Sequence, residues 1–251
     1  MSEPILETDD VRKEFGSLVA IDGVSLEFYR DEIVGIIGPN GAGKTTYVNL
    51  ISGALTPTSG RVLFKDRDIS GLKRHKRVQL GLVRSFQIPQ IYDELTVFEN
   101  VQSSVISRRQ DNNKLFTPID RHTETVEETE ELLDIFGLSA HADDETEHLP
   151  HGIRKVLDVA MSFALDPQYL LLDEPTSGVA TQEKEYVIET IVEASEAEGV
   201  TTVTIEHDMD LVKEYADRLV VLHEGSVFRE GEPELLETDS ELRRVLLGVD
   251  E

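Results

Sequence analysis

The sequence predicts an α/β fold with a parallel core sheet, a small antiparallel sheet near the amino terminus, and a group of helices inserted into the core. Three nearly continuous apolar segments, the kind that form buried parallel strands, occur at 32–37, 169–172 and 200–205. Alternating apolar residues in 19–32, with a further short segment at 61–64, indicate antiparallel strands. From about residue 95 the apolar residues recur instead with a helical period.

Three helices are expected in the inserted part. Thr96 and Glu99 have the spacing of a capping box, which predicts a helix amino terminus. A second, glutamate-rich helix is expected to begin at Glu124 and to stop at Gly137. A third is expected to begin near Ile153, because apolar residues follow it at intervals of about 3.6 residues. The polar stretch 108–114 predicts a surface loop.

The length of 251 residues is at the upper end for one domain. We therefore predict a single domain over 1–251, with a helical subdomain at approximately 88–165. No apolar run approaches the roughly 20 residues of a membrane span, and the acidic amino terminus does not resemble a secretory signal. With no cysteine for a disulfide, the expected location is the cytoplasm.

The chain is strongly acidic, with 50 Asp and Glu against 24 Lys and Arg and a formal net charge of -26. This charge repels polyanions, so nucleic acid is not expected as a partner. Two interpretations remain: a solubilising surface, or adaptation to the salt-rich cytoplasm of a halophile. The second is favoured because the acids are so numerous and are spread along the chain, and because concentrated salt screens their mutual repulsion.

Residues 38–45, GPNGAGKT, match the phosphate-binding pattern GxxxxGK[ST] between a predicted strand and a predicted helix. The glycines allow backbone N–H groups to face phosphate oxygens at a helix amino terminus. Lys44 would neutralise the β- and γ-phosphates, Thr45 would bind Mg²⁺, and Thr46 would contact a neighbouring phosphate. The predicted nucleotide-binding residues here are Gly38, Asn40, Gly41, Ala42, Gly43, Lys44, Thr45 and Thr46.

Two adjacent carboxylates follow the apolar strand at 170–172. Strands of open α/β sheets place ligands at their carboxyl ends, and adjacent residues point to opposite sides. Asp173 is therefore predicted to hold Mg²⁺, and Glu174 to act as the general base that polarises the attacking water. With the phosphate loop upstream, the sequence predicts a P-loop NTPase that hydrolyses ATP.

The whole chain resembles the ATPase family of ABC transporters. Gln87 in RSFQ (84–87) stands where that family places a glutamine that touches Mg²⁺ and the membrane partner. His207 in IEHDM (205–209) stands at the position of a histidine that contacts the γ-phosphate, and Phe15 resembles the aromatic residue that stacks on adenine. The resemblance implies ATP hydrolysis coupled to solute transport, with Lys44, Glu174 and His207 as catalytic residues.

Within the family, the chain is most similar to the ATPases of branched-chain amino-acid importers. The strings that carry this resemblance are VRSFQ (83–87), IEHDMDLV (205–212) and GEPEL (231–235). Importers of urea or amides and some lipid-export ATPases look similar, so these solutes stay open as alternatives.

Two segments depart from the family pattern. The LSGGQ signature is replaced by LPHGI (149–153), which lacks the serine, so contacts to the partner's ATP would come from His151, Gly152 and the helix that follows. The D-loop SGVA (177–180) has Ala180 in place of the usual aspartate. The effect of both departures on the coupling of two ATP sites stays open.

The resemblance also implies partners: a second copy or a related ATPase, transmembrane permease subunits, and indirectly an extracellular solute-binding protein. The expected place is the inner face of the cell membrane. A chromosome or DNA-repair ATPase is disfavoured because no long heptad segment interrupts the chain, and a translation-factor ATPase because only one cassette is present. A metal site is not expected from the irregularly spaced His141, Asp143, Asp144, His148 and His151.

Overall fold

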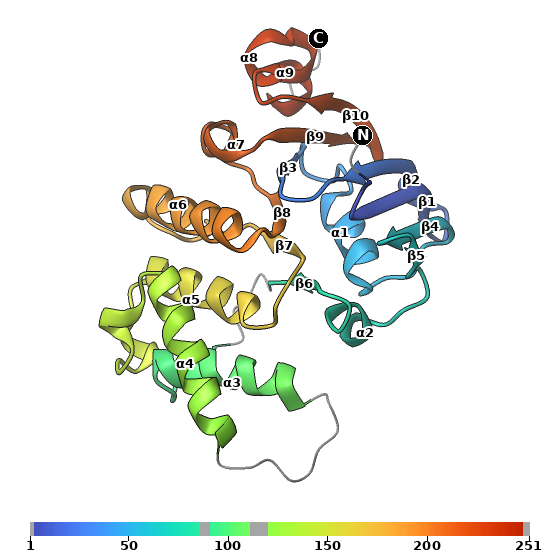
Figure 1. Ribbon diagram of the computed structural model, residues 1–251. Helices are drawn as coiled ribbons and strands as arrows, with labels where there is room; N and C mark the ends of the chain where they lie inside the picture. The colour runs from blue at the N-terminus through green and yellow to red at the C-terminus, as the bar shows by residue number, and fades with distance from the viewer. Residues whose placement is uncertain (1–2, 86–90, 111–119, 248–251) are drawn as a thin grey trace.

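A six-stranded, mainly parallel sheet forms the centre of the fold in the computed structural model, which describes residues 3–85, 91–110 and 120–247 (Figure 1). The strand order is β10-β9-β3-β8-β7-β6, and only β10 runs antiparallel to its neighbour. The strands are β3 (Ile33–Ile37), β6 (Leu82–Arg84), β7 (Tyr169–Asp173), β8 (Thr201–Ile205), β9 (Arg218–His223) and β10 (Ser226–Gly231). The predicted parallel core is confirmed, and β3, β7 and β8 are its three apolar segments.

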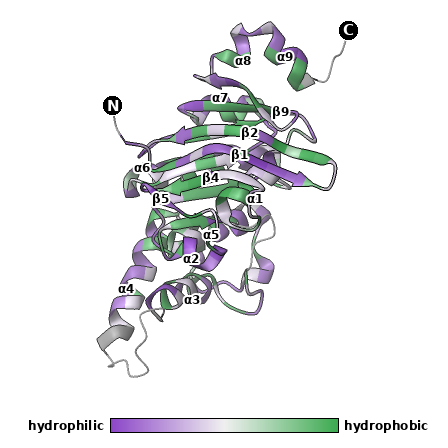
Figure 2. Cartoon of the chain, turned by 90° about the vertical axis from the view of Figure 1, so that its right-hand side faces the viewer, coloured by the Kyte–Doolittle hydropathy of each residue, from purple (hydrophilic) through white to green (hydrophobic). Residues whose placement is uncertain are grey.

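A second sheet is antiparallel, as predicted, with the order β2-β1-β4-β5 (Figure 2). Its strands are β1 (Leu6–Phe15), β2 (Leu18–Phe28), β4 (Ser59–Phe64) and β5 (Arg67–Asp68). The expected strand segment 19–32 is shorter than predicted, because β2 ends at Phe28 and a turn precedes β3. Strand β1 was not predicted at all.

The two sheets share one hydrophobic core with the first helix. Helix α1 (Lys44–Ser52) begins directly after the phosphate loop, and its Tyr47 and Leu50 are fully buried in that core. Tyr169 of β7 packs edge-on against Phe28 at 5.7 Å between ring centroids. The phosphate loop is thus fixed between a buried strand and a buried helix. The other helices around the central sheet are α2 (Arg74–Val78), α6 (Thr181–Glu198), α7 (Met209–Tyr215), α8 (Leu235–Thr238) and α9 (Ser240–Leu247).

The helices between β6 and β7 pack on a second core. They are α3 (Val97–Gln110), α4 (Asp120–Ile135) and α5 (His151–Phe163), with short 3₁₀ turns at Ser139–His141 and Thr146–His148. The capping box is present: the N–H of Glu99 donates to the Thr96 hydroxyl at 3.1 Å, and the N–H of Thr96 donates to the Glu99 carboxylate at 2.9 Å.

The ends of these helices differ in part from the sequence prediction. Helix α4 starts earlier than Glu124 and stops before Gly137, whose φ of 64° closes the helix as predicted. Helix α5 starts at His151 rather than near Ile153, because Pro150 has an extended ψ and serves as the N-cap. The loop expected at 108–114 does not include 108–110, because α3 continues to Gln110. Residues 111–114 lie outside the described residues, as does the expected boundary at residue 88.

None of the described helices combines the length and the apolar character that crossing a bilayer requires. In the described part of the chain, no group of three or more His, Asp or Glu is arranged to hold a metal ion. His141 instead contacts Asp144, with Nδ1 and Oδ2 2.7 Å apart.

Candidate functional site

The phosphate loop after β3 has a backbone that only glycine fits at several positions. Gly41 and Gly43 have φ angles of 83° and 101°, which other residues rarely adopt. A Cβ atom on Gly38 would lie 2.2 Å from the carbonyl oxygen of Leu222, and one on Gly43 would lie 2.7 Å from that of Ala20. The loop therefore packs tightly against neighbouring backbone while its turns stay open toward solvent.

The Lys44 side chain folds back over the loop that precedes it. Its Nζ donates hydrogen bonds to the carbonyl oxygens of Gly38 at 2.6 Å and Pro39 at 3.1 Å. Burial lowers the pKa of the Lys44 ammonium, and the carboxylate of Glu174 acts in the opposite direction. The cation is therefore partly removed from water and held beside the position where a phosphate would lie.

A cavity of about 620 Å³ opens over the loop, a size typical of small-molecule sites. Its walls come from the β1–β2 hairpin, the phosphate loop, the end of β7, the segment after β8 and the β9–β10 turn. The lining residues are Leu18, Val19, Ala20, Asn40, Gly41, Ala42, Gly43, Lys44, Thr45, Thr46, Glu174, His207, Glu224 and Gly225. Most of the residues predicted for nucleotide binding are thus brought together.

Phe15 lies at the end of β1 and is 47% exposed, with the Lys13 ammonium 5.2 Å from its ring centroid. It does not line the cavity, but Leu18 and Val19 of the same hairpin do. An exposed ring at the rim is available to stack on a planar base, and Leu18, 63% exposed, adds apolar surface beside it.

Glu174 and His207 are in direct contact. Nε2 of His207 and Oε1 of Glu174 are 3.0 Å apart. Glu174 has a left-handed φ of 51°, and its N–H donates to the carbonyl oxygen of Ile205 at 2.9 Å. A non-glycine residue in this conformation is strained, and such strain is frequent at functional sites.

Asp173 is 4% exposed, and the guanidinium of Arg84 binds its Oδ2 at 2.5 Å. Arg84 also donates to Oδ1 of Asn49 on α1 at 2.6 Å, and its buried Nε has no hydrogen-bond partner among the described residues. Sequence reasoning missed Arg84 and Asn49, although an arginine that ends the apolar segment at 82–84 was a signal. With a bound Mg²⁺, Thr45 and Asp173 would supply hydroxyl and carboxylate oxygens, the ligand type that this ion prefers, so the residues fit.

The predicted signature residues lie elsewhere in the same chain. A Cβ on Gly152 would lie 2.9 Å from Oε2 of Glu183, and a Cβ on Gly178 would lie 2.9 Å from Nε2 of His151. His151 and Gly152 therefore pack beside the start of α6 and the D-loop, and they do not line the cavity. Gln87 lies outside the described residues.

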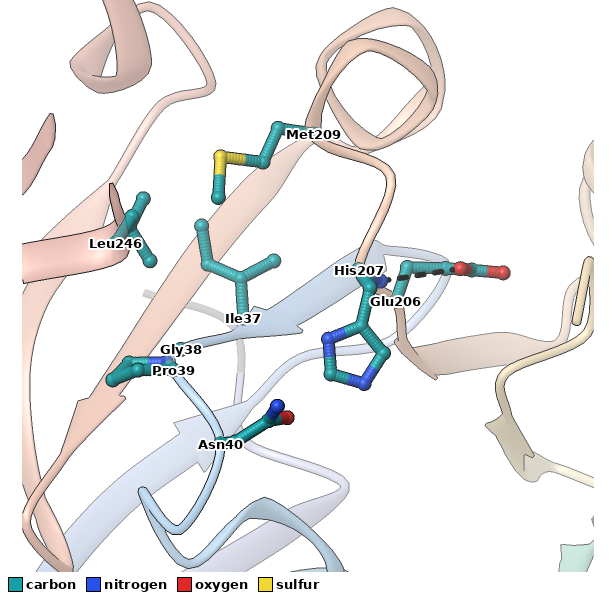
Figure 3. A pocket seen from close by; sticks show the side chains of 8 residues that line it. All are labelled: Ile37, Gly38, Pro39, Asn40, Glu206, His207, Met209 and Leu246. Carbon is teal, nitrogen blue, oxygen red and sulfur yellow. Dashed lines mark hydrogen bonds between the residues drawn. The ribbon is translucent and has the colours of Figure 1, made fainter. Parts of the chain in front are cut away.

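A smaller cavity of about 260 Å³ adjoins the first, and Asn40 and His207 line both (Figure 3). Its lining residues are Ile37, Gly38, Pro39, Asn40, Glu206, His207, Met209 and Leu246. In Figure 3 the His207 ring points toward Asn40, whereas the Glu206 carboxylate turns away from the cavity. Burial raises the pKa of Glu206, and hydrogen bonds from Thr176 oppose this effect. Sequence reasoning also missed Glu206.

Comparison with known proteins gives consistent matches over nearly the whole chain. The family model described as ABC transporter matches residues 21–177. The chain is 35% identical to the high-affinity branched-chain amino acid transport ATP-binding protein LivG of Escherichia coli K12, over 99% of both chains. It is 33% identical to the corresponding protein BraF of Pseudomonas aeruginosa, again over 99% of both.

Solved structures agree with the sequence matches. The ADP conformation of an ATP-binding cassette of an ABC transporter superposes with a TM-score of 0.85 at 31% identity, covering 99% of this chain and 100% of that one. A nucleotide-free cassette gives a TM-score of 0.83, also at 31% identity, with the same coverage.

Proposed function

This chain belongs to the ABC transporter family, and we propose that it energises the import of branched-chain amino acids through membrane permease subunits. Proteins of this family hydrolyse ATP, and the cavity over the phosphate loop supports that reaction because Lys44, Glu174 and His207 line it. The observation that supports this choice of solute is the set of relatives named for branched-chain amino acid transport. They include bacterial proteins and a 35% identical archaeal protein of Methanocaldococcus jannaschii that covers 92% of this chain.

Nucleotide binding begins at the phosphate loop. Backbone N–H groups of Gly41 and Gly43 and the amino terminus of α1 attract the phosphates, because the helix dipole favours negative charge there. Lys44 exchanges its carbonyl partners on Gly38 and Pro39 for phosphate oxygens, which places its charge where negative charge accumulates during the reaction. Phe15 stacks on the adenine at the rim.

Glu174 is the proposed general base, and His207 orients it. An ionised carboxylate only accepts hydrogen bonds, so Nε2 of His207 donates to Glu174 at 3.0 Å. That bond fixes the carboxylate on the side of the cavity that faces the phosphate loop. The attacking water loses its proton to Glu174, and His207 contacts the γ-phosphate.

Mg²⁺ would neutralise charge on the β- and γ-phosphates. Thr45, Asp173 and Gln87 are the residues proposed to hold it. Arg84 already engages Oδ2 of Asp173, which fixes the direction of this carboxylate before the ion arrives.

The active form proposed is a dimer, either of two copies or with a related ATPase. Gly152 and His151 of one chain would face the ATP bound at the phosphate loop of the other. The movement that closes the dimer would be transmitted through the segment around Gln87 to the permease on the inner face of the cell membrane. An extracellular solute-binding protein would supply the solute, and no nucleic acid takes part.

The test is to co-purify the chain with its permease subunits and the solute-binding protein in lipid vesicles. Leucine, isoleucine and valine should each raise the ATPase rate and be transported when ATP is supplied on the side of the cassette. Urea, short amides and lipids serve as the comparison solutes. Stimulation by one of these, with none by the three amino acids, would replace the proposed solute while leaving the ATPase assignment intact.

A further inference from the structure

A buried carboxylate, that of Glu206, joins the two segments that contain Glu174 and His207. Glu206 is 4% exposed and lies at the end of β8, immediately before His207. Its Oε1 accepts two hydrogen bonds from Thr176, from the N–H at 3.1 Å and from the hydroxyl at 2.9 Å. Its Oε2 accepts the N–H of His207 at 3.3 Å (Figure 3).

These contacts close a ring. Thr176 is two residues after Glu174 along the chain, and Glu206 directly precedes His207. The hydrogen bonds from Thr176 to Glu206 and from His207 to Glu174 connect the two segments at both ends. A side-chain pair held in this way loses rotational freedom before the substrate arrives, which is what a reactive pair needs.

We infer that Glu206 is a positioning residue for ATP hydrolysis, which sets the distance between Glu174 and His207 by binding the turn after β7 to the segment after β8. Only a carboxylate suits this position, because its two oxygens face N–H and O–H donors on both sides. Glutamine would turn an NH₂ group toward one of those donors, either Thr176 or the N–H of His207. The inference rests on the roles proposed above for Glu174 and His207.

Glu206→Gln should therefore keep the fold and lower kcat by about 10-fold or more, while KM for ATP changes by less than about 2-fold. The reason is that the phosphate loop and its Lys44 contacts lie outside the ring. Thr176→Val, which removes the hydroxyl but keeps the N–H, should lower kcat by roughly 3-fold. Thr176→Ser, which keeps both donors, should restore the native rate.

The decisive readout is a double-mutant cycle with His207→Ala. If Glu206 acts through His207 and Glu174, its loss should cost less than about 2-fold in the His207→Ala background. The same 10-fold loss in both backgrounds would mean a general structural role, and a native kcat for Glu206→Gln would mean no role; either result overturns the inference.

The same series separates this inference from the proposed function. Native activity in Glu174→Gln and His207→Ala would remove the proposed roles of those two residues and the inference with them. Loss of activity in both, with Glu206→Gln and Thr176→Val at the native rate, would overturn the inference alone. If Glu206→Gln fails to fold, Thr176→Val takes its place in the double-mutant cycle with His207→Ala, and Thr176→Ser serves as the control.

Discussion

The imidazole Nε2 of His207 lies 3.0 Å from Oε1 of Glu174. The donor that we propose His207 uses toward a γ-phosphate is therefore engaged with Glu174, the proposed general base. Binding of ATP must either share that proton between the two acceptors or move the ring. With the roles proposed for these two residues, ATP should change their contact and ADP should not, because only the triphosphate offers a competing acceptor at that place.

Replacing Glu174 with glutamine should leave ATP binding intact and lower turnover by about 100-fold or more, because an amide cannot accept the proton of the attacking water. The introduced amide oxygen can still accept the His207 hydrogen bond, so the site keeps its shape. Size-exclusion chromatography with ATP and Mg²⁺ should show a nucleotide-bound dimer. Glu193→Gln, on the exposed face of α6, is the control and should hydrolyse ATP normally. Turnover at the native rate in Glu174→Gln would show that another group is the base.

A buried aspartate in α5 predicts how stability depends on pH. Asp158 is 8% exposed, and burial raises its pKa to about 7, opposed in part by Lys155. At a pH below the ordinary aspartate value of 3.8, the carboxyl is protonated in both the folded and the unfolded chain. As the pH rises toward 7, the unfolded chain loses the proton first, so the free energy of unfolding falls; above 7 the loss is complete.

Asp158→Asn does not titrate, so its thermal midpoint should exceed the native midpoint by an amount that grows from pH 4 to 7 and then stays constant. The upper bound on the difference in unfolding free energy is about 4 kcal/mol, from a shift of roughly three pKa units. Melting curves from pH 4 to 9 measure it, with the exposed Asp143→Asn as the control. A constant difference across this range would mean that Asp158 titrates as it does in the unfolded chain.

Whether a part of the site could be predicted from the sequence depends on how far apart in the chain its contacting residues lie. The phosphate loop and the Thr96–Glu99 capping box were predictable, because each is a local pattern whose hydrogen bonds join near neighbours in the chain. Glu206 was not, because a charged residue after a strand usually faces solvent, and its burial depends on Thr176, 30 residues away. The ion pair of Arg84 with Asp173 spans 89 residues and was missed for the same reason.

Strand β1 was missed for a different reason. Its sequence LETDDVRKEF does not alternate between apolar and polar residues, and its pairing with β2 shifts register at Thr8, Val11 and Lys13. Each irregularity moves the side chains to the other face, so the period of two is lost. The buried Thr8 shows the result: its hydroxyl contacts the Tyr47 hydroxyl at 3.0 Å, a core position that hydropathy alone does not reveal.

The charge balance predicts a dependence on salt. Thermal stability and ATPase activity should both rise as KCl goes from about 0.1 to 2 M, because the Debye length falls to about 3 Å at 1 M and the repulsion among excess carboxylates is screened. Helix α6 alone exposes five glutamates, at 185, 189, 193, 196 and 198. A variant with these five changed to glutamine should show a shallower rise. A native melting point that is flat or falls with KCl would leave only the solubilising role of the acids.

The last prediction concerns the altered signature at the start of α5. Gly152 is buried at the second position of this helix, where backbone N–H groups and the helix dipole would face the partner's γ-phosphate. Gly152→Asp would place a carboxylate there, so the ATP-induced dimer and hydrolysis should both be lost, even in the Glu174→Gln background. ATP should bind the single chain with near-native affinity, because the Lys44 side of the site is unchanged.

The structure adds a control that this test needs. A Cβ at Gly152 would lie 2.9 Å from Oε2 of Glu183, so Gly152→Asp also brings two carboxylates together within one chain. Glu183→Gln removes that repulsion, and the double variant should still fail to dimerise if the partner's phosphate is the cause. Recovery of the dimer in the double variant would place the defect within the chain. Normal hydrolysis by Gly152→Asp itself would show that residues 149–153 do not contact the partner's nucleotide, and the proposed site across the dimer would have to be abandoned.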